Sequence, residues 1–146
     1  AQVLARAIAS GASKHGTAPR LAHRWTGTVR LPDRTAFPER DYFTVGASTC
    51  GQIGLGFKPF HRSGEVPDRF HMLGIHTTTL GFIRSLPTVW RGQTIGGDKT
   101  YEKLTDAAIL EAKDGKVPYT LDGDVYVHDG PLEVKAGPRI RIVIPS

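Results

Sequence analysis

Apolar and polar side chains alternate along several short segments of this chain, which is the pattern of strands that have one buried face. Residues 21–31 place mainly apolar side chains on one face and polar ones on the other: Leu21, His23, Trp25, Val29 and Leu31 against Arg24, Thr26, Thr28 and Arg30. Residues 32–40 are expected to form a turn or loop. A second strand, rich in aromatic and β-branched residues, is expected over residues 41–49, and a third over residues 70–77.

Helical spacing predicts one substantial helix over residues 78–91. Its apolar face carries Leu80, Ile83, Leu86 and Trp90, and Pro87 is expected to break the helix near its end. A shorter amphipathic helix is expected over residues 1–9, where apolar side chains also recur at helical spacing.

The remainder of the chain is strand-like. Strands are expected over residues 105–113, 116–121, 125–128, 132–136 and 139–144, with turn signals at Asp114-Gly115, Asp129-Gly130 and Ala136-Gly137-Pro138. Short strands at regular spacing, joined by turns, predict a mainly β fold. We expect a β-sandwich with one inserted helix.

The composition agrees with a single folded domain. The chain has 146 residues, of which 39% are hydrophobic and 23% charged, and its 17 Gly and 10 Pro lie between short apolar runs. The formal net charge of +5 suits an anionic partner such as a lipid headgroup, a nucleotide or a nucleic acid, but Lys and Arg are scattered. A nucleic-acid-binding β-barrel is disfavoured, because most aromatic residues fall on strand faces that are expected to be buried.

The expected location is cytoplasmic, with at most peripheral contact at the inner membrane surface. No run approaches the roughly 20 apolar residues needed to cross a bilayer. The single cysteine, Cys50, cannot form an internal disulfide and is expected to be a buried, unreactive thiol. Because the sequence starts at Ala1 without an initiator Met, residues 1–14 are interpreted as a helix and linker from a missing upstream domain, and residues 15–146 as the β-sandwich domain.

Three patterns that could suggest a cofactor have simpler interpretations. His71 and His76 are five residues apart, which places them on opposite faces of a strand, and no cysteine pair could complete a transition-metal site. The glycines of residues 51–56 stand in the wrong order for a dinucleotide loop. In GGDKT, residues 96–100, Lys99 replaces the last glycine of a phosphate-binding GGDGT loop, so we expect a polar turn before the next strand.

The most informative stretch is YTLDGDVY, residues 119–126. Two carboxylates, Asp122 and Asp124, flank Gly123. Such a group can form a turn, accept backbone hydrogen bonds, hold a divalent cation or act as a general base. The local pattern leaves these alternatives open.

The order of segments around this turn resembles the C-terminal part of the bacterial diacylglycerol kinase and sphingosine kinase group of lipid kinases. PYTLDGDVYVHDGPLEVKAGPRIRIVIP is similar to the end of such kinases, where an Asp-Gly-Glu motif precedes a hairpin and a final strand. Two earlier segments are similar to a strand with a glycine-containing stretch and to a strand followed by a helix with a Leu-Pro break: DYFTVGASTCGQIGLGF and RFHMLGIHTTTLGFIRSLPTVWRG. The resemblance covers residues 41–146.

This resemblance implies a two-domain kinase of which the chain is the substrate-side domain. The missing N-terminal domain would bind ATP and Mg²⁺ through GGDGT, and the intact enzyme would transfer the γ-phosphate to a lipid hydroxyl, so this chain alone would be inactive. Asp122 and Asp124 would be catalytic. Asp124 stands where the family usually has Glu, and would act as the general base with a side chain one methylene shorter. Asp68 would match an acidic ligand of a structural Mg²⁺.

Two further alternatives stay open. The helix face around Leu80, Phe82, Ile83 and Trp90 could line a pocket for acyl chains or belong to the ordinary core, and core is favoured. The alternative function is a non-catalytic module that binds a lipid or another apolar ligand, which the change from Glu to Asp124 would favour. The sequence does not identify the lipid acceptor or the oligomeric state.

Overall fold

The computed structural model describes residues 24–54, 56–121 and 124–138. The helix expected over residues 1–9 and the strand expected over residues 139–144 lie outside them. The described elements are β1 (Trp25–Arg30), β2 (Ala36–Tyr42), β3 (Thr44–Ser48), β4 (Phe70–Ile75), α3 (Thr79–Trp90), β5 (Thr100–Thr105), β6 (Ala107–Ala112), β7 (Lys116–Leu121), β8 (Asp124–Asp129) and β9 (Leu132–Lys135).

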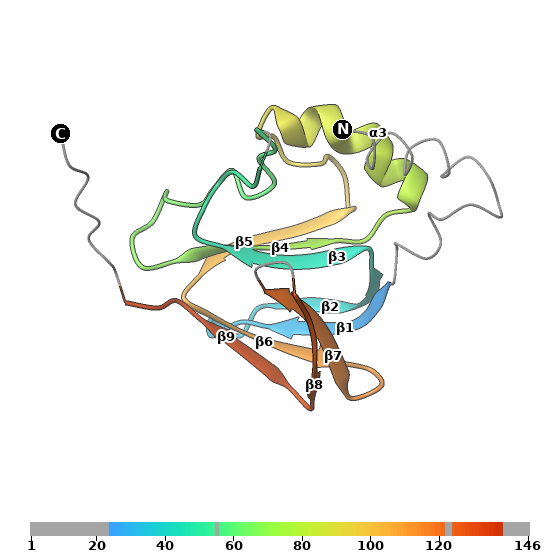
Figure 1. The fold of residues 1–146 in the computed structure, drawn as a ribbon, viewed down its shortest axis with the longest axis vertical. Helices are drawn as coiled ribbons and strands as arrows, with labels where there is room; N and C mark the ends of the chain where they lie inside the picture. Colours follow the sequence, from blue (N-terminus) through green and yellow to red (C-terminus); the bar gives the residue numbers. More distant parts are fainter. Residues whose placement is uncertain (1–23, 55, 122–123, 139–146) are drawn as a thin grey trace.

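These strands form three antiparallel sheets. One sheet has the order β2-β1-β6-β9, a second has the order β3-β4-β5, and β7 pairs with β8 as a two-stranded ribbon. In Figure 1 the β3-β4-β5 sheet lies between α3 and the four-stranded sheet. The expected mainly β fold with one helix is therefore confirmed for the described residues.

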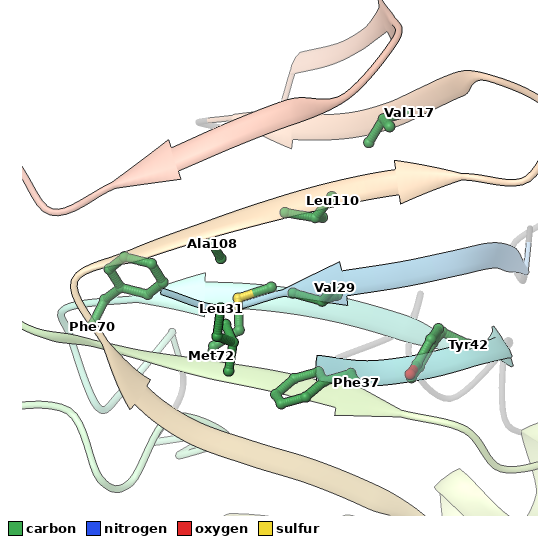
Figure 2. Packing of buried hydrophobic residues seen from close by; sticks show 9 residues of the cluster. All are labelled: Val29, Leu31, Phe37, Tyr42, Phe70, Met72, Ala108, Leu110 and Val117. Atoms are coloured by element: carbon green, nitrogen blue, oxygen red, sulfur yellow. The ribbon is translucent and has the colours of Figure 1, made fainter. Parts of the chain in front are cut away.

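The main core fills the space between the two larger sheets. Figure 2 shows its nine buried side chains, which come from strands of both sheets, from the β7–β8 ribbon and from the turn after β1: Val29, Leu31, Phe37, Tyr42, Phe70, Met72, Ala108, Leu110 and Val117. Val117 is the member from β7, and its burial holds the ribbon against the sandwich. Burial of this apolar surface is the main force that holds the sheets together.

The chain changes sheets twice within segments that the pattern predicted as single strands. Tyr42 ends β2 in one sheet, and Thr44 begins β3 in the other. In the same way Thr105 ends β5, and Ala107 begins β6 in the opposite sheet. The predicted strands at residues 41–49 and 105–113 are thus each divided, because alternation continues through a corner and does not reveal it.

Two further predictions need correction. Residues 36–42 form strand β2 instead of continuing a loop, and Pro38 is tolerated there because β2 is the edge strand of its sheet. Helix α3 runs through Pro87 to Trp90 without a break. Its last turn is held by Val89, which is buried, and by the amides of Arg91 and Gly92, which donate to the carbonyl oxygens of Pro87 and Val89.

A glycine in β1 tests the packing of the four-stranded sheet. A Cβ atom at Gly27 would collide with the carbonyl oxygen of Glu111 on the paired strand β6 and with the indole of Trp25. We predict that Gly27→Ala lowers the free energy of unfolding, measured in urea, by about 1–3 kcal/mol. Gly96→Ala is the control, because a Cβ there meets nothing within 4 Å. Equal stabilities of the two variants would contradict this packing.

Candidate functional site

The candidate site lies on the face of β4 that looks toward α3. Side chains alternate along a strand, so His71, Leu73 and Ile75 share this face while Phe70 and Met72 enter the main core. Leu73 and Ile75 form a second buried cluster with Val89 of α3 and with Ile95. All six residues of β4 are buried, so the strand separates two apolar layers.

An apolar pocket of about 210 Å³ opens within this second layer. Its walls come from β3, β4, α3 and the loop between β3 and β4, and every lining side chain is apolar except that of Thr44: Phe43, Thr44, Gly46, Ile53, Phe57, Pro59, Phe60, Leu73, Ile75, Phe82 and Val89. Such a lining offers few partners to a polar ligand and suits a hydrocarbon group.

The face of α3 for which ordinary core was favoured over a pocket lining is only partly buried. Phe82 lines the pocket and stacks on Phe43, with the ring centroids 4.5 Å apart. Leu80 and Trp90 are instead 53% and 45% exposed. Val89, which was not part of the predicted face, is the second lining residue of α3, and Trp90 contacts Phe57 edge-on from outside.

A glycine in β3 shapes the pocket wall. A Cβ at Gly46 would lie 2.7 Å from Cζ of Phe60, which is far closer than side-chain atoms approach one another. Gly46 therefore lets the Phe60 ring lie directly against β3. The same ring meets His71 edge-on at a centroid distance of 6.0 Å, so Phe60 stands between the pocket and the polar group behind it.

That polar group is centred on the carboxylate of Glu102 in β5. The Nε2 atom of His71 lies 3.6 Å from Oε2 of Glu102, and Nε2 of His61 lies 4.0 Å from the same oxygen. The hydroxyl of Thr94 donates a hydrogen bond to this oxygen at 3.2 Å. We call these four residues, His61, His71, Thr94 and Glu102, the Glu102 cluster.

The two histidines and Glu102 are largely removed from water, whereas Thr94 is exposed. The His71 side chain is fully buried, and those of Glu102 and His61 are 11% and 20% exposed. Burial works to raise the pKa of Glu102, but the nearby ring of His71, followed by His61 and the Thr94 hydroxyl, outweighs it, so that the pKa lies below its ordinary value. Glu102 is thus ionised at neutral pH.

Sequence patterns indicated only part of this arrangement. The prediction that His71 and His76 occupy opposite faces is confirmed, because His76 stacks on Tyr101 at 5.1 Å on the side of the main core. His61 and Glu102 were not singled out, since 41 residues separate them in the chain. The available signal was His71 itself, a polar residue inside the otherwise apolar run FHMLGI.

The acidic residues that the resemblance indicated lie apart from the pocket. Asp124 is the exposed first residue of β8, paired in register with Leu121, whereas Asp122 lies outside the described residues. Asp68 precedes β4, is exposed and has a positive φ of 60°. Neither Asp124 nor Asp68 lines the pocket. Within residues 24–54, 56–121 and 124–138, no three His, Cys, Asp or Glu side chains are arranged to hold a metal ion.

The prediction that Cys50 is buried was wrong. Cys50 is exposed, because the chain leaves the sheet after β3, where the Ser48 hydroxyl accepts a hydrogen bond from the Cys50 amide at 3.0 Å.

The prediction of a polar turn at the GGDKT segment is confirmed. In GGDKT, residues 96–99 are exposed, and the next strand begins at Thr100. The segment is therefore a turn before β5.

A scan against protein-family models and a search of curated proteins both found no match to this chain. In the part of the chain that the structure describes, no helix is long and apolar enough to cross a membrane.

The lowered pKa of Glu102 predicts how the stability depends on pH. A carboxylate with a lowered folded-state pKa stabilises the fold above its unfolded pKa, and this contribution disappears as pH falls through the folded value. We predict that Glu102→Gln costs about 1–2 kcal/mol in urea unfolding at pH 7, and that the difference from the unsubstituted chain shrinks below pH 4.5, the ordinary value. A difference that stays constant down to acid pH would contradict this role.

Proposed function

We propose that this chain is the lipid-binding, acceptor-side domain of an ATP-dependent lipid kinase of the diacylglycerol kinase type. The observation that carries the proposal is the apolar pocket beneath α3, about 210 Å³ in volume and lined by apolar side chains from four parts of the chain. Pockets of this kind bind hydrocarbon groups, since nearly all of the lining loses contact with water when a ligand enters.

Three further features support the proposal. Three of the elements that carry the resemblance to lipid kinases, β3, β4 and α3, also contribute to the pocket. Asp124 is exposed at the start of β8, where its carboxylate can be reached by a substrate. The ribbon around it also exposes Leu121 and Val125, at 62% and 74%, so the acid stands among apolar side chains that suit a lipid surface.

In this proposal another domain binds ATP. An upstream domain of the intact protein would hold ATP and Mg²⁺, and this chain would hold the acyl chains of the lipid in the pocket and present a general base, outside the pocket, to the attacking hydroxyl. Asp124 is the proposed base, with Asp122 beside it in sequence, and Asp68 is the proposed ligand of a structural Mg²⁺. In the alternative function, the same pocket binds an apolar ligand without catalysis.

The pocket can be tested at its rim. Ile53 is 47% exposed and lines the pocket, so Ile53→Asp should fold while placing a charge where the acyl chain enters. We predict that the substitution weakens binding of dioctanoylglycerol to the chain, measured by titration calorimetry, by about tenfold or more.

Val66→Asp is the matched control for this test. Val66 is 37% exposed in the same connection between β3 and β4, and it does not line the pocket. Its affinity for dioctanoylglycerol should equal that of the unsubstituted chain. Equal losses in both variants, or no binding by the unsubstituted chain, would oppose lipid binding in this pocket.

Phosphoryl transfer is tested in the longer protein that would carry the ATP-binding domain. With γ-labelled ATP and dioleoylglycerol in mixed micelles, Asp124→Asn should lower kcat by about 100-fold or more, the usual loss when a general base is removed. Asp129→Asn is the control, because Asp129 is exposed at the other end of β8. The isolated 146-residue chain should transfer no phosphate.

The outcomes separate the two candidate functions. Dioctanoylglycerol binding together with an active Asp124→Asn enzyme would remove Asp124 as the base. Binding without phosphoryl transfer by the longer protein would favour the non-catalytic module. Phosphoryl transfer by the isolated chain would contradict the assignment of ATP to another domain.

A further inference from the structure

The oxygen Oε2 of Glu102 is a point where separate parts of the chain meet. His71 approaches it from β4, His61 from the connection between β3 and β4, and Thr94 from the segment after α3. The Thr94 hydroxyl is also 3.5 Å from Nε2 of His61. One carboxylate on β5 thereby ties the sheet to two segments that lie outside it.

These two segments are continuous with the pocket walls. Phe60, the residue before His61, lines the pocket, and so does Phe57 three residues earlier. Gly92, which follows α3, lies beside His61, because a Cβ at Gly92 would be in ordinary contact with the Cβ of His61 at 3.4 Å. The Glu102 cluster therefore fixes the loop wall of the pocket and the end of the helix wall at once.

The cluster contains fewer hydrogen bonds than its groups could make. Among the described residues, neither ring nitrogen of the buried His71 has a hydrogen-bond partner, and the separation of 3.6 Å from Glu102 is longer than a hydrogen bond. Buried polar atoms without a hydrogen-bond partner cost free energy. A small approach of the cluster members, or an added charge, would therefore stabilise the cluster.

The charged residues that follow Glu102 and His61 in sequence have other partners. From β5, the neighbouring Lys103 pairs with Asp33 at 2.9 Å. From the β3–β4 connection, Arg62 pairs with Glu65, and the Lys58 methylenes pack near Gly92. From β3, the residue opposite His71 is the uncharged Ser48.

Two histidine rings face a single carboxylate in this cluster. A single proton on the two histidines places a positive charge within 3.6–4.0 Å of the Glu102 carboxylate. A second proton would put like charges on two rings whose centroids are 5.4 Å apart, with only one carboxylate to compensate. Histidine is also the residue whose charge ordinarily changes between pH 5 and 8.

We infer that the Glu102 cluster is a proton-responsive latch, in which uptake of one proton by the His61–His71 pair draws the Phe57–Phe60 wall against the β-sheet and organises the apolar pocket. The pocket then binds an apolar ligand more tightly under mildly acidic conditions than under mildly basic ones, because less ordering is left to be done on binding. The latch acts on the pocket whether or not its natural ligand is a kinase substrate.

The test uses Nile red, an uncharged apolar dye, so that the ligand itself does not titrate. The dissociation constant of the full chain for the dye should fall by about threefold to tenfold between about pH 8 and about pH 5.5.

Substitutions then test whether the pH dependence of dye binding arises from the Glu102 cluster. His61→Gln, at a partly exposed position, and Glu102→Gln should both bind the dye with little pH dependence, whereas His128→Gln, on the exposed strand β8, should behave as the unsubstituted chain does. Circular dichroism at each pH confirms that every variant is folded, and His61→Gln alone decides the matter if Glu102→Gln unfolds.

Four results would overturn the latch. They are an affinity that is independent of pH, an affinity that falls on acidification, a full pH dependence in His61→Gln, and no dye binding by the unsubstituted chain at either pH. A failure of phosphoryl transfer by the longer protein would leave the latch intact, so the two proposals fail separately.

Discussion

The burial of β4 on both faces is the constraint on which the rest of the structure depends. Phe70 and Met72 on one face close the core between the two larger sheets, and Leu73 and Ile75 on the other face close the layer beneath α3. Such a strand must be covered from both sides, because apolar surface left in water would cost about 25 cal/mol for each Å². The layer of helix and loop that encloses the pocket is therefore a requirement of the sheet.

The same constraint explains the polar cluster. A strand buried along its whole length places His71 where no water reaches it, and a buried polar ring needs a polar partner. Glu102 on the neighbouring strand brings a carboxylate to 3.6 Å from this ring, and His61 and Thr94 reach the same oxygen from outside the sheet. A polar residue in a dry layer thus becomes the anchor of the pocket wall.

Alternation and turn residues correctly predicted several strands and the start of the helix. They did not predict the features that depend on contacts between distant parts of the chain. Strands β4 and β7, and the start of α3, follow from runs such as FHMLGI and from Thr78, whose hydroxyl caps the helix at the Gly81 amide. The corners at Phe43 and Asp106 were missed, because the chain changes sheets there without interrupting the alternation. The Glu102 cluster was missed for a related reason: its members meet only when β4, β5 and two connecting segments are in place.

The proposed function depends on lipid binding beneath α3. Nuclear Overhauser contacts between dioctanoylglycerol and the chain in solution would locate the bound lipid. We predict contacts from the acyl methylenes to the rings of Phe57, Phe60 and Phe82, which line the pocket. Contacts confined to the exposed β7–β8 ribbon, with none to these three rings, would contradict it.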